Sequence, residues 1–206
     1  MKKPIKSLLV LAILCAPALA SAQGYYGRGG PGASAPRGFQ NRAGRLALGF
    51  SVGLGGMSDD GSSITSCINC DYNPLAFEVD GHIGGMLSPR LALLFEAQVN
   101  GQTIHSDFFG DDTILTQGAA MIAAQVWVLP QLWLKGGLGF ANLQTDDTFV
   151  TRELGTGGAV LGAIGFEILS APNFALDLQG RIIAGTYNSG NDHLTSGTIG
   201  LGINWY

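Results

Sequence analysis

The chain has 206 residues; 13% are charged and 32 are glycine, against about 25% charged and about 7% glycine in ordinary soluble domains. The formal net charge is −4, and this acidic balance argues against nucleic acid as a partner. No stretch after residue 22 reaches the roughly 18 uninterrupted apolar residues of a membrane-spanning helix, so a helical membrane protein is not predicted.

Residues 1–22 predict a secretory signal peptide. Three lysines precede a short apolar run, which ends at Ala22 in an A-x-A cleavage pattern. A lipoprotein signal that uses Cys15 is the alternative, but the preceding Leu14 is bulky where such signals have a small residue. Cleavage leaves 8 basic residues against 15 acidic ones, so the mature charge is 8 minus 15, or −7.

Residues 23–44 are rich in glycine, proline and serine, and contain three arginines and no acid. Such a composition cannot bury a core, so we predict a disordered, Gly-rich periplasmic leader. The alternative is that Arg28, Arg37 and Arg42, with the aromatic residues between them, contact anionic lipid headgroups or cell-wall polymer.

The stretch from Arg45 to Ser58 predicts a membrane-spanning strand. Successive side chains of a strand point to opposite faces. One face is apolar here, and from Ala47 to Gly55 the other carries only small residues, where a soluble sheet would carry charge and bulk. The apolar face comprises Leu46, Leu48, Phe50, Val52 and Leu54. This division fits lipid outside and a narrow, filled interior inside.

The same alternation predicts seven further strands. They cover residues 75–88, 91–100, 116–129, 132–140, 156–169, 174–182 and 196–205. An even count lets a closed barrel place both termini on one side, and closure removes sheet edges that a bilayer does not tolerate. The predicted fold class is therefore all-β, an eight-stranded antiparallel up-and-down transmembrane β-barrel over residues 45–206.

The connections predict the orientation. Those after the second, fourth and sixth strands are tight and contain Pro89, Pro130 and Pro172, whereas the other connections are longer and polar. Short turns are periplasmic and long loops are external in such barrels. The predicted external loops are Met57–Tyr72, Ile104–Thr113, Thr145–Glu153 and Tyr187–Thr195.

The chain resembles the small outer-membrane β-barrel proteins of Gram-negative bacteria, of the OmpA transmembrane domain, OmpX and OmpW type. The resemblance rests on the signal peptide, the eight alternating strands, the loop asymmetry and the aromatic end Trp205-Tyr206. The resemblance implies a place in the outer membrane, among its lipids and lipopolysaccharide, and insertion by the barrel-assembly machinery. In that family the last residue is typically aromatic and faces lipid, whereas here Trp205 has that phase and Tyr206 lies one residue beyond.

Charged and titratable side chains fall on the inward face of the predicted strands. They are Glu78, Asp80, His82, Glu96, Lys135, Glu167, Asp177 and Arg181. A basic side chain facing lipid would cost roughly 2 to 4 kcal/mol at mid-depth, so we expect these groups to form a lumen ion network. Trp127 and Trp133 should fill the periplasmic end.

We expect this network to form two stacked clusters. Judged by height above the periplasmic strand ends, Lys135 belongs with Glu167 and Asp177. The second cluster combines Arg181 with Asp80, Glu96 and His82. Both clusters would block the lumen, because an eight-stranded barrel is only wide enough to be filled by side chains.

Two functions remain open at this point. One is a structural or surface-interaction barrel with a plugged polar lumen and acidic extracellular loops. The other is a narrow channel for small or apolar solutes, as the OmpW-like resemblance implies. The predicted loops hold ten acids against the single Arg152; these acids form either a solvated surface or a divalent-cation bridge to lipopolysaccharide phosphates. No cofactor is predicted, and neither the metal content nor the extracellular partner follows from the sequence.

Enzymatic activity is not predicted. A lipid A deacylase needs a serine activated by a histidine with an acidic partner. The available groupings are His193 with Ser196, and His105 with Ser106 and Asp107. Neither has the His-x-Ser spacing associated with that activity.

Cys67 and Cys70 form a CxxC pair in the first external loop. Such a pair is a small disulfide, a redox pair or half of a zinc site, and an oxidising compartment favours the disulfide.

We predict that Cys67 and Cys70 are bonded to each other in the mature protein. The intact mass should then be lower by two hydrogens than that of the reduced protein, because disulfide formation removes both thiol protons. Stoichiometric titration of free thiols in protein kept from reductant would contradict the bond.

Overall fold

A computed structural model describes residues 38–63, 75–106, 112–146, 151–187 and 192–206, without the side chains of residues 62, 63, 105, 106, 112 and 151. The predicted signal peptide, most of the leader, Cys67 and Cys70 lie outside the described residues. Residues 39–206 form one compact unit, which we call the barrel unit. All of the described strands belong to it.

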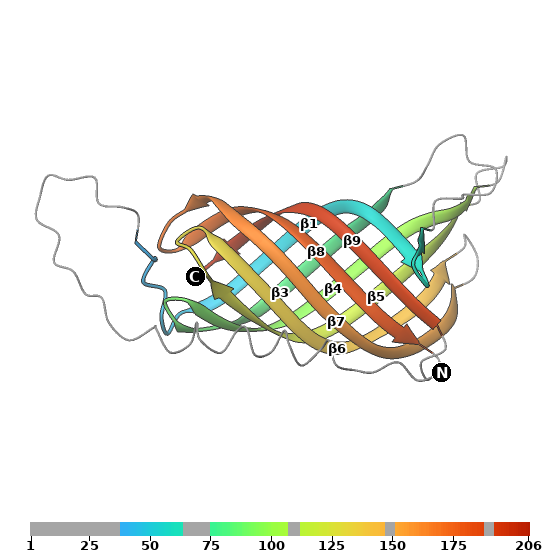
Figure 1. Ribbon diagram of the computed structural model, residues 1–206, viewed down its shortest axis with the longest axis horizontal. Helices are drawn as coiled ribbons and strands as arrows, with labels where there is room; N and C mark the ends of the chain where they lie inside the picture. The colour runs from blue at the N-terminus through green and yellow to red at the C-terminus, as the bar shows by residue number, and fades with distance from the viewer. Residues whose placement is uncertain (1–37, 64–74, 107–111, 147–150, 188–191) are drawn as a thin grey trace, which may run out of the picture. The chain divides into compact units, whose positions relative to one another are not determined.

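Eight long strands form a closed antiparallel barrel (Figure 1). They are β1 (Leu46–Asp59), β3 (Ala76–Ser88), β4 (Leu91–Ser106), β5 (Asp112–Trp127), β6 (Leu132–Asp146), β7 (Thr151–Ser170), β8 (Phe174–Tyr187) and β9 (Asp192–Trp205). Each pairs with its neighbours in sequence order, and β1 also pairs with β9 to close the barrel. A two-residue strand, β2 (Ser62–Ser63), folds back onto the end of β1. The predicted fold class is confirmed.

The outer face of the barrel is apolar. Large hydrophobic side chains on it are exposed by 39% at Val79 and by up to 80% at Phe140. A soluble protein rarely tolerates so much contiguous apolar surface, whereas lipid covers it in a membrane. The described part of the chain contains no helix that is long and apolar enough to cross a bilayer.

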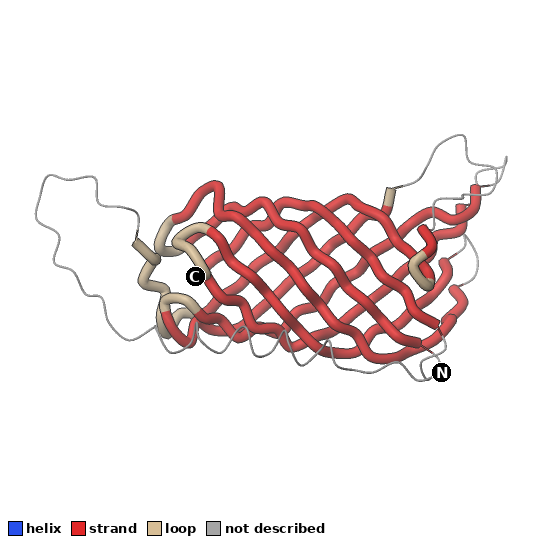
Figure 2. Tube along the Cα trace, in the orientation of Figure 1, coloured by secondary structure: helices blue, strands red, loops and turns tan. Residues whose placement is uncertain are grey.

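The two ends of the barrel differ. At one end, short turns join β3 to β4, β5 to β6 and β7 to β8, and the C-terminus lies beside them (Figure 2). We call this the tight-turn end. At the opposite end, which we call the loop end, the connections include all four internal stretches outside the described residues.

Several strands continue further toward the loop end than the sequence pattern predicts. The chain from Ile104 to Ser106 remains in β4, and Thr151 to Gly155 already belong to β7. Alternating apolar residues mark only the part of a strand that faces lipid. The backbone hydrogen bonds between strands continue beyond the lipid, where the side chains are polar. The predicted loop bounds were therefore too wide.

The turn lengths generate a prediction about orientation. In a chain with Cys67→Ser and Cys70→Ser, a cysteine at Glu153 near the loop end should react with a membrane-impermeant thiol reagent on intact cells. A cysteine at Ala171, in the turn before β8, should react only after the cells are permeabilised. Both sites are exposed in the barrel, so labelling of Ala171→Cys on sealed cells would reverse the orientation.

Candidate functional site

The lumen holds all eight residues that the sequence assigns to it. Seven are at most 5% exposed: Glu78, Asp80, Glu96, Lys135, Glu167, Asp177 and Arg181. The eighth, His82, has a side chain that is 9% exposed. Every buried charge here needs a partner, because an isolated charge in such surroundings is very costly. The partners define three layers across the barrel.

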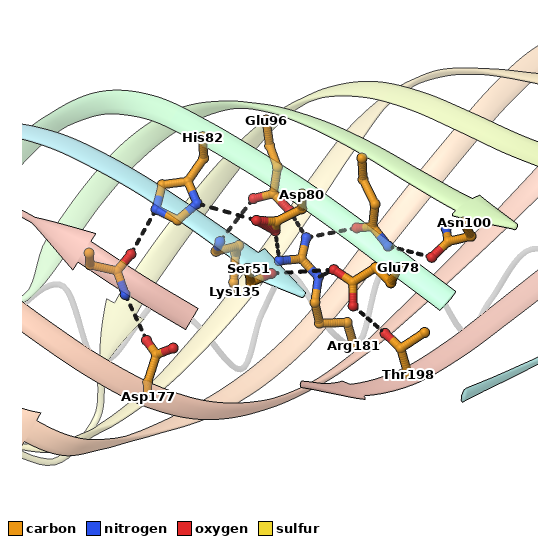
Figure 3. A network of polar contacts seen from close by, with 12 residues as sticks. Ser51, Glu78, Asp80, His82, Glu96, Asn100, Lys135, Asp177, Arg181 and Thr198 are labelled. Carbon is orange, nitrogen blue, oxygen red and sulfur yellow. Dashed lines mark hydrogen bonds and ion pairs between the residues drawn. The ribbon is translucent and has the colours of Figure 1, made fainter. Parts of the chain in front are cut away.

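The middle layer is built around Arg181, which reaches from β8 across the lumen (Figure 3). Its Nε lies 3.3 Å from Glu78 Oε1, and its two terminal nitrogens donate to Asp80 and Glu96. One of them also donates to Gln98 Oε1 at 2.8 Å. β4, which carries Glu96, is four strands from β8 in either direction around the barrel. The side chain therefore spans the lumen and ties opposite walls together.

Lys135 has a different partner from the expected one. Its Nζ donates to Glu96 Oε2 at 2.9 Å, not to Glu167 or Asp177. Glu167 instead accepts a hydrogen bond from the indole nitrogen of Trp127 at 2.8 Å. Asp177 accepts one from the indole nitrogen of Trp133 at 3.0 Å. Strands in a barrel tilt strongly, so counting residues from the strand ends misjudges which side chains share a height.

Trp133 is the tryptophan that bonds to Asp177. It is 1% exposed, and its ring lies over Gly165 of the neighbouring strand β7. A Cβ at that position would collide with the ring atoms. Glycine is therefore required there for the indole to lie flat against the lumen wall.

His82 belongs to a relay of hydrogen bonds rather than to the Arg181 contacts. Its Nε2 lies 2.9 Å from Asn204 Oδ1, and Asn204 Nδ2 donates to Asp177 Oδ2 at 2.8 Å. Its other ring nitrogen, Nδ1, lies 3.9 Å from Asp80 Oδ1. The predicted clusters are thus joined into one network by Asn204, a residue that the sequence analysis did not select.

Arg42 lies at the tight-turn end, buried in the lumen, and not at lipid headgroups or cell-wall polymer, the contacts that the sequence analysis gave as an alternative. It is 2% exposed, and its guanidinium forms a two-pronged pair with Glu167, at 2.7 and 3.1 Å. A third bond goes to the carbonyl of Ala171 at 2.9 Å. The sequence contained one signal: the predicted lumen set has five acids and only two permanent bases, which indicates that a further cation is needed.

Further contacts join the N-terminal and C-terminal segments of the barrel unit to the tight-turn end. The ring of Tyr206 lies 3.9 Å from the guanidinium carbon of Arg42, and Arg45 donates to the carbonyl of Pro172 at 3.0 Å. Phe39 packs against the guanidinium of Arg90, at 3.8 Å from the ring centre. Residues 39–44, which we assigned to the leader, therefore belong to the barrel unit.

The upper layer, toward the loop end, is less charged. Ser196 donates to Gln117 Oε1 at 2.8 Å, and Gln117 Nε2 donates to the Tyr187 hydroxyl at 2.7 Å. β5 and β9, which carry Gln117 and Ser196, are four strands apart, so this pair also crosses the lumen. Buried apolar side chains surround it, namely Met57, Leu115, Leu143, Ile183 and Leu194.

The candidate catalytic groups are not brought together where the structure describes them. Ser196 points into the lumen and donates a hydrogen bond to Gln117, whereas His193 on the same strand is exposed. The side chains of His105 and Ser106 lie outside those described, as does Asp107. Asp71, Asp111 and Asp147 of the acidic loops are likewise not described.

Comparison with solved structures supports the fold. Ail, the attachment invasion locus protein of Yersinia pestis, solved with the heparin analogue sucrose octasulfate, has a TM-score of 0.51 and 14% identity over 79% of this chain and 99% of that chain. Neisserial surface protein A gives 0.50 and 10% over 78% and 95%. No protein-family model matches the sequence, and a search of curated proteins found no match.

The chain has the fold of a small eight-stranded transmembrane β-barrel. Its place in the outer membrane of a Gram-negative bacterium remains the location that the sequence pattern predicts. At such low identity the likeness concerns the fold, so the role of this barrel must be argued from its own lumen and surface.

The pairing at the tight-turn end generates a prediction. Arg42→Ala should lower the free energy of unfolding in urea by about 3 to 5 kcal/mol, because it strands the buried Glu167 carboxylate. Adding Glu167→Gln should recover part of this loss, since the stranded charge is removed.

Arg45→Ala is the matched control for this experiment. Arg45 bonds to Pro172 and Asn173 at the surface, so its loss should cost at most about 1 kcal/mol. Equal effects of Arg42→Ala and Arg45→Ala would show that Arg42 does not brace the barrel.

Proposed function

We propose that this protein is a non-conducting outer-membrane barrel that acts through its surface, with the acidic loop end meeting the exterior. The observation that carries the proposal is the pair of buried ion pairs that Arg181 of β8 makes with Asp80 of β3 and Glu96 of β4. We call this set of contacts the Arg181 crossbar. A solute would have to break these pairs to pass, and breaking one costs several kcal/mol.

The other two layers support the same conclusion. Arg42 and Tyr206 close the tight-turn end, and the Gln117 to Ser196 bond crosses the lumen nearer the loop end. A solute would therefore meet three successive barriers built from different parts of the chain. The redundancy argues for a permanently filled interior rather than a gate, because a gate needs one element that moves.

The exposed residues at the loop end favour contacts outside the cell. Asp59, Asp60, Glu153 and Asp192 lie there and are exposed, and anionic side chains bind lipopolysaccharide phosphates only through divalent cations. Two proteins with a similar fold are named for attachment and for the cell surface. Both facts support a surface role, in which the barrel serves as a rigid anchor.

Single-channel recording in planar bilayers tests the proposal. Purified wild-type protein should give no stable open-pore current. Arg42→Ala should also remain silent, since it opens only the tight-turn end and leaves the Arg181 crossbar intact. A steady conductance from the wild type would overturn the proposal in favour of the narrow channel. A steady conductance from Arg42→Ala alone would show that the middle layer is not a barrier.

A further inference from the structure

Two buried atoms in the middle layer face each other with no hydrogen-bond donor between them. Asp80 Oδ1 and His82 Nδ1 lie 3.9 Å apart, and neither has a hydrogen-bond partner among the described residues. Asp80 is 1% exposed and the His82 side chain 9%. Buried polar atoms are normally paired, so each exception calls for a physical reason.

The hydrogen bonds on the far side of His82 fix its tautomer. Asp177 only accepts hydrogen bonds when ionised, so Asn204 must direct its NH₂ group toward Asp177 and its oxygen toward His82. His82 Nε2 therefore carries the proton and donates it to Asn204. In the neutral ring, Nδ1 is then an unprotonated nitrogen whose lone pair is directed at the Asp80 carboxylate.

Among the described residues, the lumen also has an uncompensated charge. Five buried carboxylates (Glu78, Asp80, Glu96, Glu167, Asp177) face three buried cationic side chains (Arg42, Lys135, Arg181). The formal excess is five minus three, or two negative charges, with His82 neutral. Buried net charge is strongly unfavourable, and a single divalent cation would cancel it.

Glu96 completes a set of three ligands. One ligand atom from each of Asp80, His82 and Glu96 can be chosen so that all lie within 4.8 Å of one another. Ligand atoms around a tetrahedral Zn²⁺ are about 3.3 Å apart, given Zn–N and Zn–O distances near 2.0 Å, so small side-chain movements would suffice. Arg181 and Lys135 already bond to the Glu96 carboxylate, but each of its oxygens keeps a second lone pair.

We propose that Asp80, His82 and Glu96 form a lumen site for a divalent transition-metal ion of the Zn²⁺ class. An imidazole with two carboxylates suits such an ion, whereas Mg²⁺ and Ca²⁺ take oxygen ligands. The relay through Asn204 to Asp177 gives the histidine the outer hydrogen bond that metal-bound imidazoles have. Because the lumen is filled, the ion would enter while the barrel folds.

Refolding with and without metal tests the site. The full mature chain is refolded in the presence of Zn²⁺ or of a chelator, desalted, and analysed for bound zinc by mass spectrometry. A background with Cys67→Ser and Cys70→Ser removes thiols that bind zinc in their own right. The wild-type lumen should retain about one equivalent of Zn²⁺ per chain when refolded with the ion.

His82→Gln and His193→Gln form the matched pair of variants. The first removes the lumen nitrogen and should weaken zinc binding by at least roughly tenfold. The second removes an exposed histidine of β9 and should retain the ion. Absence of retained zinc in the wild type, or equal retention in both variants, would overturn the proposal.

A second measurement needs no variant and remains informative if His82→Gln does not fold. In wild-type protein labelled with ¹⁵N-histidine and refolded with the chelator, one ring should show a protonated Nε2 and a bare Nδ1. Refolding with Zn²⁺ should shift that Nδ1 resonance. A ring protonated on both nitrogens, unchanged by zinc, would show that a proton pairs His82 with Asp80 instead and would refute the metal site.

Discussion

The width of an eight-stranded barrel is the constraint on which this structure depends. Its interior is just large enough to be filled by side chains, and the strand pleat sends every second residue into it. An inward polar group therefore has little water to bond with and must find another inward group. The result is a chain of contacts in which Arg181, Glu96 and Lys135 satisfy one another across three strands. Arg42 supplies a further cation from outside the strands.

The alternation of apolar and other residues along the sequence identified the strands and the buried face of each. It did not identify which side chains pair with one another inside the lumen. Phase is a local property of each strand, so Glu78 or Arg181 could be assigned to the lumen from its neighbours alone. Height depends on tilt and register stagger, which are properties of the closed sheet. The hydrogen bond from Lys135 to Glu96 was therefore not predicted, and Asn204 was overlooked because an inward amide carries no charge.

The place of Arg42 in the lumen was missed for a different reason. Composition predicts that a Gly-rich stretch is not a strand, but it says nothing about a single residue at the edge of that stretch. The burial of Arg42 depends on Glu167 and Tyr206, which are 125 and 164 positions further along the chain. Only the closed barrel brings these three residues together, so no local pattern contains the information.

Closure of the barrel ties these contacts to folding. Pairing of β1 with β9 joins segments separated by most of the chain, and such long-range contacts carry a larger loop-closure entropy than the hairpins between sequential strands. The bonds from Arg42 to Glu167 and from Arg181 to Asp80 can form only when the walls have met. They therefore stabilise the closed barrel without stabilising an open sheet, whose unpaired edges a bilayer would not tolerate. The buried charge pairs of the lumen join strands that are not neighbours in the sheet, so they favour closure of the barrel.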